Sequence, residues 1–149
     1  MQVAIKTVPG KDYDATKIQQ IDEQCDLFVI QRNSNPAPEP PSICIPSGKT
    51  ITVWVPARIS GVSSQTDQDS WDALVASYME PIAEAYREGV MSLLVPELGT
   101  GRLMWSPLRS AQAARKAVEE LSGLLPEDFR ICFAIKDVDF QDWDDTIRF

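Results

Sequence analysis

Apolar and polar residues alternate along short segments at the start of the chain, and this pattern predicts two strands with a helix between them. "QVAIKTV" (2–8) has the alternation of a half-buried strand, and "CDLFVIQ" (25–31) is a short β-rich apolar run. Between them, "DATKIQQIDEQ" (14–24) places two isoleucines on one helical face and offers Asp14 or Thr16 as the N-cap. The predicted order is therefore strand, helix, strand.

Further short apolar runs predict four more strands. "SICIP" (42–46) and "KTITVWVPARI" (49–59) are separated by "SGK", as in a hairpin, and "VMSLLVP" (90–96) is typical of a buried strand. "RICFAIKDV" (130–138) predicts the last strand. By contrast, "NSNPAPEPPS" (33–42) holds four prolines, which excludes a central strand or a continued helix.

Apolar spacings of three and four predict two longer helices. The first begins at Asp69 after the polar connection "SGVSSQTDQDS", ends at Gly89, and should be kinked or divided at Pro81. The second begins with Ser106 as its cap and continues to Gly123, and "DFQDWDDTIRF" (139–149) predicts a short terminal helix. This order predicts a single α/β domain over residues 1–149, with three layers and a mixed central sheet.

Composition narrows the classes of function. The net charge of −8, with a pI near 4.5, argues against generic binding to nucleic acid or to anionic membranes. The chain has no histidine, which excludes histidine-based triads and imidazole metal ligands, and we predict no metal or cofactor. The three cysteines lack metal-site or redox-motif spacing and indicate buried thiols, so we expect a soluble cytoplasmic protein.

The segment "VPELGTGRLMWSP" (95–107) carries the strongest chemical signal. It leads from a predicted buried strand through Gly99 and Gly101 to a predicted helix N-terminus, where exposed N–H groups favour an anion. The same two glycines would also suit a simple tight turn. A dinucleotide fingerprint fails because Met104 occupies its third glycine position, and "PSGKT" (46–50) predicts a turn because a strand, and not a helix, follows it.

Two motifs resemble those of macro domains, the α/β modules that bind ADP-ribose. "CDLFVIQRN" (25–33) resembles the family's strand motif and keeps Asp26 and Asn33, and the segment from Pro96 to Trp105 resembles the family's later glycine loop. The chain departs from the family at Ile30, where an asparagine is usual. It also has "NSNPAPEPPS" where the family has a glycine-rich loop that grips the diphosphate and the distal ribose.

The resemblance implies a ligand site with named residues. The backbone of Gly99, Thr100 and Gly101, together with Arg102 and Leu103, would line the diphosphate, and Trp105 would pack near the distal ribose. An aspartate after the first strand would face the adenine amino group, and we choose Asp12 over Asp14 because it lies beside Gly10. Asn33 would stand near the distal ribose, where family hydrolases hold an asparagine.

Three hypotheses follow. The leading one is that the chain binds ADP-ribose, a related phosphorylated nucleotide or an ADP-ribosylated macromolecule, with residual ADP-ribosyl or ADP-ribose phosphate hydrolase activity through Asn33. The alternative is that the scaffold is a protein-binding module of the inhibitor or immunity type whose acidic surface meets a basic protein. The third is an enzyme that acts on a different nucleotide.

Overall fold

The chain folds around one central sheet. The structure is a computed structural model that describes residues 1–22, 24–32, 44–55 and 64–147. Within these ranges the strands are β1 (Gln2–Val8), β2 (Leu27–Arg32), β3 (Cys44–Ser47), β4 (Thr50–Trp54), β5 (Ser92–Pro96) and β6 (Arg130–Lys136). The helices are α1 (Ala15–Gln20), α2 (Ser64–Arg87), α3 (Pro107–Leu121) and α4 (Phe140–Ile147), with 3-10 turns η1 (Gly10–Asp12), η2 (Gly101–Leu103) and η3 (Asp137–Asp139).

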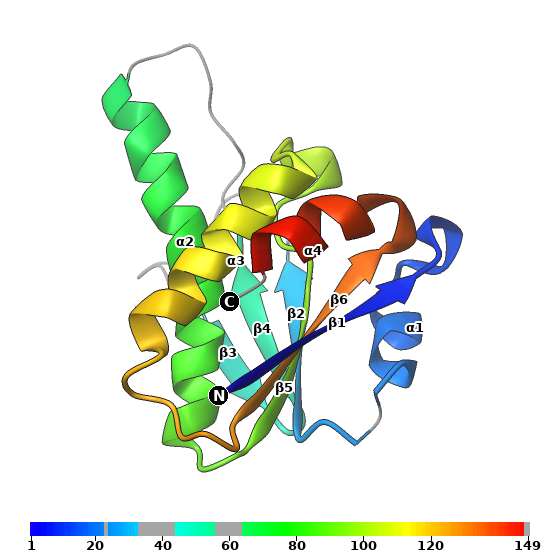
Figure 1. Ribbon diagram of the computed structural model, residues 1–149, viewed down its shortest axis with the longest axis vertical. Coiled ribbons are helices and arrows are strands. Elements are labelled where there is room, and N and C mark those ends of the chain that lie inside the picture. Colours follow the sequence, from blue (N-terminus) through cyan, green and yellow to red (C-terminus); the bar gives the residue numbers. More distant parts are fainter. Residues whose placement is uncertain (23, 33–43, 56–63, 148–149) are drawn as a thin grey trace.

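The predicted three-layer α/β architecture with a mixed sheet is confirmed. The strand order is β1-β6-β5-β2-β4-β3, and every neighbouring pair is parallel except β3 with β4. Helices α2, α3 and α4 cover one face and α1 covers the other (Figure 1). After β2 the chain moves to β3 and β4, whereas after β5 it moves the opposite way to β6. In parallel sheets, ligands bind beyond the carboxyl ends of strands at such a reversal.

The β3–β4 connection is a hairpin turn, as the sequence predicts. Gly48 has a φ of 60°, and Ser47 pairs with Thr50 across the turn. "PSGKT" is thus confirmed as a turn. It lies at the amino end of β4, on the opposite edge of the sheet from the carboxyl ends of β2 and β5.

Helix α2 differs from the sequence prediction at its start and middle. It begins at Ser64, five residues before Asp69, and continues through Pro81 without a division. The polar connection can be helical because hydrogen bonds on the helix surface support it, such as that from Gln68 Nε2 to Asp72 Oδ1 at 2.8 Å. The predicted stop is confirmed: Gly89, with a φ of 79°, ends the helix in a Schellman arrangement.

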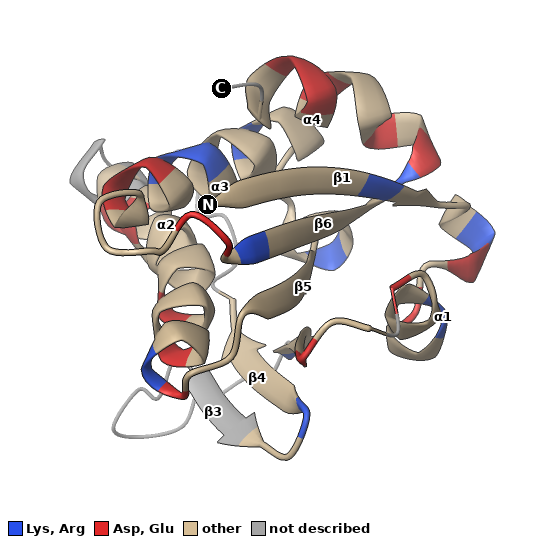
Figure 2. Ribbon diagram, turned by 60° about the horizontal axis from the view of Figure 1, so that its bottom comes forward, with Lys and Arg blue, Asp and Glu red and all other residues tan. Residues whose placement is uncertain are grey.

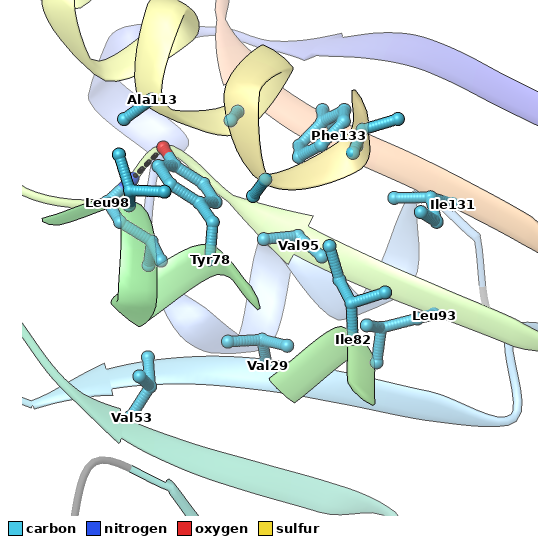
Figure 3. Close-up of a cluster of buried hydrophobic side chains, with 14 of the residues drawn as sticks. Val29, Val53, Tyr78, Ile82, Leu93, Val95, Leu98, Ala113, Ile131 and Phe133 are labelled. Atoms are coloured by element: carbon cyan, nitrogen blue, oxygen red, sulfur yellow. Dashed lines mark hydrogen bonds between the residues drawn. The ribbon is translucent and has the colours of Figure 1, made fainter. Parts of the chain in front are cut away.

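The main core lies between the sheet and helices α2, α3 and α4. Figure 3 shows Tyr78 and Ile82 of α2 packed toward β5 and β6, and α4 contributes Trp143, which is fully buried. A smaller cluster beneath α1 includes Cys25 and Cys132, which are buried free thiols as predicted, while the Cys44 side chain lies outside the described part of the chain. None of the described helices combines the length and apolar composition of a membrane span.

Candidate functional site

The loop between β5 and α3 needs glycine at two positions for different reasons. Gly99 and Gly101 have φ values of 84° and 77°, in the left-handed region that side chains disfavour. At Gly99 a Cβ would also lie 2.6 Å from Trp105 Cδ1, so there is no space for a side chain. At Gly101 a Cβ would meet nothing within 4 Å, so only the backbone requires glycine there and the space above it is open.

Side chains from three elements fix the start of this loop. The N–H of Leu98 donates to Tyr78 Oη of α2 at 2.8 Å, as Figure 3 shows, and its carbonyl accepts from Ser110 Oγ of α3 at 2.6 Å. The N–H of Gly99 donates to Gln31 Oε1 of β2 at 2.8 Å. The loop is therefore held by the core, and the Gly99 N–H is already occupied by Gln31.

The next N–H groups of the loop have no such acceptors. Those of Thr100, Gly101 and Arg102 make no hydrogen bond within the part of the chain that the structure describes. They stand at the start of η2, where first-turn amides lack intrahelical partners, and Gly101 and Arg102 are exposed. Three donors at the carboxyl end of β5 are thus available to an anion.

The residues that follow support the loop from below. Trp105 is 5% exposed, and its ring centroid lies 6.4 Å from that of Trp71. The guanidinium of Arg109 lies 3.9 Å from the centre of the Trp71 ring. Leu103 is partly buried against the main core. Trp105 therefore contacts the underside of Gly99 and offers little surface to a ribose.

A cavity of about 230 Å³ lies beside this loop. It is bounded by α1, by most of the length of β2, by β5 and the loop that follows it, and by the last residue of β6. Its lining comprises Tyr13, Asp14, Ala15, Ile18, Gln19, Phe28, Val29, Ile30, Gln31, Leu94, Pro96, Glu97, Thr100 and Lys136.

The structure places Asp14, and not the predicted Asp12, on the wall of the cavity. Asp14 lines the cavity, and its Oδ1 caps α1 by accepting from the Lys17 N–H at 2.9 Å. Asp12 belongs to η1, where its N–H donates to Pro9, and it does not line the cavity. Asp14 reaches the cavity because it caps α1, whose first residue, Ala15, also lines the cavity.

Tyr13 is a cavity residue that the sequence analysis missed. Its hydroxyl donates to the Ala134 carbonyl of β6 at 2.6 Å and accepts from the Glu97 N–H at 2.7 Å. Burial, with the nearby Glu97 charge, raises the pKa of Tyr13 well above its usual value, so this hydroxyl keeps its proton. No local pattern signals this role, because Tyr13 joins segments that are more than eighty residues away.

Glu97 is a second missed residue. Its side chain is fully buried, and neither carboxylate oxygen has a hydrogen-bond partner among the described residues. Lys136 Nζ lies 3.5 Å from Glu97 Oε2. Burial raises the pKa of Glu97 to about 8, the Asp139 carboxyl adds to the rise, and Lys136 opposes it. An acidic residue directly after an apolar strand was the available signal.

The two residues that the motif of residues 25–33 keeps, Asp26 and Asn33, come before and after β2 in the sequence. Asp26 lies at the amino edge, where its Oδ2 accepts from the Met91 N–H at 3.0 Å and its own N–H donates to Ser92 Oγ at 2.8 Å. Asp26 thus ties β2 to β5. Asn33, the candidate catalytic residue, lies outside the described residues. No group of acidic or cysteine residues in the described ranges is arranged to hold a metal ion.

Comparisons with known proteins identify the fold. No family model matches the sequence, and no curated protein matches it. Among solved structures, the chain is similar to the macro domain of ganglioside induced differentiation associated protein 2, with a TM-score of 0.73, 12% identity, and coverage of 97% of this chain and 81% of that one.

Two further similar structures contain nucleotides. The Trypanosoma brucei macrodomain in complex with ADP has a TM-score of 0.70 and 13% identity, and the complex with ADP-ribose has a TM-score of 0.63 and 16% identity. Each comparison covers 99% of this chain and 69% of the other. The chain therefore has a macro-domain fold, with a sequence that is distant from these proteins.

Proposed function

We propose that this protein binds ADP-ribose or a related phosphorylated nucleotide at the carboxyl edge of its sheet, where the parallel strands end. The observation that carries the proposal is the row of consecutive N–H groups at Thr100, Gly101 and Arg102, which have no acceptor among the described residues. Diphosphate oxygens are strong acceptors for such a row, and Gly101 leaves space for them to approach.

The neighbouring cavity has the chemistry to hold a base. Phe28 and Ile18 supply apolar surface for a flat ring, and Asp14 supplies a carboxylate that accepts from an amino group. We place adenine there, with Asp14 in the role that the sequence analysis gave to Asp12. Arg102, which is exposed, adds positive charge on the phosphate side of the loop.

Calorimetric titration of ADP-ribose into wild type and Gly101→Glu tests this assignment. The glutamate side chain would fill the open space and repel the diphosphate, so we expect saturable wild-type binding that is abolished in the variant. Gly48→Glu is the matched control: it adds the same charge at a positive φ with equal open space, but at the opposite edge of the sheet. Absence of heat from wild type at millimolar ADP-ribose would refute the proposal.

Hydrolysis of an ADP-ribosyl bond is a separate part of the proposal. Asn33 follows β2 directly and remains our candidate for orienting substrate or water. Release of ADP-ribose from a modified protein by wild type, and its loss in Asn33→Ala, is the expected result. Equal release by both proteins would remove Asn33 from the mechanism.

A protein-binding role is the second candidate, and one observation favours it. Figure 2 shows acidic residues gathered along η3 and α4, and beside them Val138 and Phe140 are 80% and 39% exposed. An acidic surface with exposed apolar side chains suits a basic protein partner. This role becomes the leading one if the ADP-ribose titration gives no binding.

A further inference from the structure

Lys136 brings a positive charge to the wall of the cavity. It is the last residue of β6, and its Nζ lies 3.2 Å from Thr100 Oγ1 and 3.5 Å from Glu97 Oε2. The same Nζ lies 5.3 Å from the centre of the Tyr13 ring. Of the residues that line the cavity, Lys136 is the one cation in the described ranges.

The Lys136 ammonium has N–H donors that no acceptor among the described residues uses. A lysine ammonium carries three N–H donors, and Lys136 makes one hydrogen bond within the described residues, to Thr100. Its side chain is 27% exposed, so it is only partly shielded from a ligand. The Thr100 N–H, which has no acceptor in that part of the chain, belongs to the residue that Lys136 contacts.

We propose that Lys136 is a ligand-binding cation that holds a phosphate group between its ammonium and the Thr100 main chain, and that Glu97 controls its availability by gaining or losing a proton. This inference rests on the proposed function and extends it. It assigns the anion a side-chain contact, and it makes the affinity for phosphorylated ligands dependent on pH.

Glu97 would control the availability of Lys136 because its carboxylate and the ligand phosphate compete for the positive charge of Lys136. Among the described residues, four groups interact electrostatically with the Glu97 carboxyl: Lys136 from β6, Asp139 from η3, Tyr13 from the segment before α1, and Tyr78 from α2. Tyr13 and Tyr78 both have raised pKa values because they are buried, so they stay neutral near neutral pH.

The direction of the pH effect follows from this arrangement. When Glu97 is protonated, Lys136 keeps an uncompensated charge that attracts phosphate. When Glu97 ionises, it attracts Lys136 and neutralises that charge. The pKa of Glu97, near 8, places the change just above neutral pH. Affinity for ADP-ribose should fall as the pH rises through 8, although the diphosphate itself does not titrate there. Binding at that pH should draw a proton onto Glu97.

The first test removes the charge. Lys136→Met keeps an apolar stem, and we expect ADP-ribose to bind at least about tenfold more weakly at pH 7, as for a lost hydrogen bond to a charged group. Lys136→Arg should restore most of the affinity. Lys17→Met is the matched control, because Lys17 lies on α1, is exposed and does not line the cavity. It should bind within about threefold of wild type.

The second test removes the titratable carboxyl group of Glu97. In Glu97→Gln, affinity should be equal at pH 6.5 and pH 9, whereas in wild type it should fall severalfold, with proton uptake seen as a dependence of the heat on the buffer. If Lys136→Met folds poorly, the double variant Lys136→Met/Glu97→Gln replaces the pair with neutral groups of similar size. It should bind as weakly as expected for the single variant, at either pH.

The outcomes separate the two proposals. Wild-type binding that is lost in Gly101→Glu but kept in Lys136→Met overturns the role of Lys136 and leaves the proposed function intact. If wild type does not bind ADP-ribose, the proposed function fails, and pyrophosphate is then titrated while the NMR signal of the Lys136 Cε is followed. No movement of that signal overturns the inference as well, whereas a saturable shift supports an anion site on Lys136.

Discussion

Two buried carboxylates, one near the amino ends of the strands (the amino edge) and one at the carboxyl ends (the carboxyl edge), have pKa values shifted in opposite directions. At the amino edge, Asp22 is buried but lies 3.3 Å from Lys6 Nζ and 3.6 Å from Arg130 Nη2. Burial alone would raise its pKa, but the contacts with Lys6, Cys25 and Arg130 together lower it. At the carboxyl edge, Glu97 has one lysine at 3.5 Å and an acidic neighbour, and its pKa is raised.

Under the proposed function, this difference separates a carboxylate that stabilises the fold from a carboxylate at the proposed binding site. Asp22 has two cations and contributes to folding, whereas Glu97 must share one lysine with the ligand loop through Thr100. Among the described residues, the carboxyl edge combines N–H groups without acceptors, an open space over Gly101 and a buried carboxylate with no hydrogen bond at either oxygen, whereas only Oδ2 of Asp22 is buried without a hydrogen bond. Polar groups that folding leaves unsatisfied are those that a ligand can satisfy.

The largest expected effect is a stabilisation by Glu97→Gln at alkaline pH. Because burial raises the pKa of Glu97 to about 8, the folded protein should hold a proton at Glu97 between pH 5 and 8 that the unfolded chain has lost. Stability therefore falls as the pH rises toward 8, by about 1.4 kcal/mol per pH unit from this group. Glutamine removes that slope, so the variant should exceed wild type by several kcal/mol at pH 9.

Urea unfolding of wild type and Glu97→Gln between pH 5 and pH 9 measures this difference in stability. Burial raises the pKa values of the Cys25 and Cys132 thiols to about 12 and about 11, so these thiols also lower stability where the unfolded thiols ionise, but this contribution is the same in wild type and variant and cancels in their difference. Parallel stability curves for wild type and variant would mean that Glu97 is not the group that titrates, and would remove the contrast with Asp22.

The second effect concerns the glycine loop at the same edge. Gly99→Ala places a Cβ against Trp105 at a positive φ, and we expect a loss of about 3 kcal/mol in unfolding free energy. Gly101→Ala is its control: the φ is similar but the space is open, so a loss of about 1 kcal/mol is expected. Equal losses would show that contact with Trp105 does not shape the loop.

The third and smallest effect concerns the amino edge. Asp22→Asn removes the charge that faces Lys6 and Arg130 and should cost about 2 kcal/mol at pH 7. The contribution of Asp22 is present above the pKa of the unfolded carboxyl and is lost as the pH falls through the lowered folded pKa. The difference from wild type should therefore vanish in acid, and a difference that persists there would mean that packing, and not charge, is lost.

Local patterns were enough to predict most of the fold. Alternation identified β1, the apolar runs identified β2 and β5, and Ser106 and Gly89 marked helix ends because caps act within one turn. The start of α2 at Ser64 was missed because polar residues there have no periodic signal. Pro81 did not divide that helix, since packing of the flanking turns outweighs the missing hydrogen bond.

The site was predicted only where it is local. Gly99 and Gly101 are adjacent to a strand end and carry their own signal. Lys136 meets the loop through the pairing of β6 with β5, and Tyr13 through the pairing of β1 with β6, and no pattern along the chain brings them together. Sequence patterns therefore predict the loop that carries the main-chain donors but not the side chains that surround it.

The hydroxyl of Tyr78 has a consequence for how recognition would proceed. Because Tyr78 in the core of α2 holds the Leu98 N–H, and Ser110 holds the Leu98 carbonyl, the loop has its shape before any ligand arrives. Such a preorganised loop loses little conformational entropy on association, so less of the contact free energy of a ligand is offset by ordering the loop. Damage to α2 far from the cavity would then appear first as slower, looser recognition, while the protein is still folded.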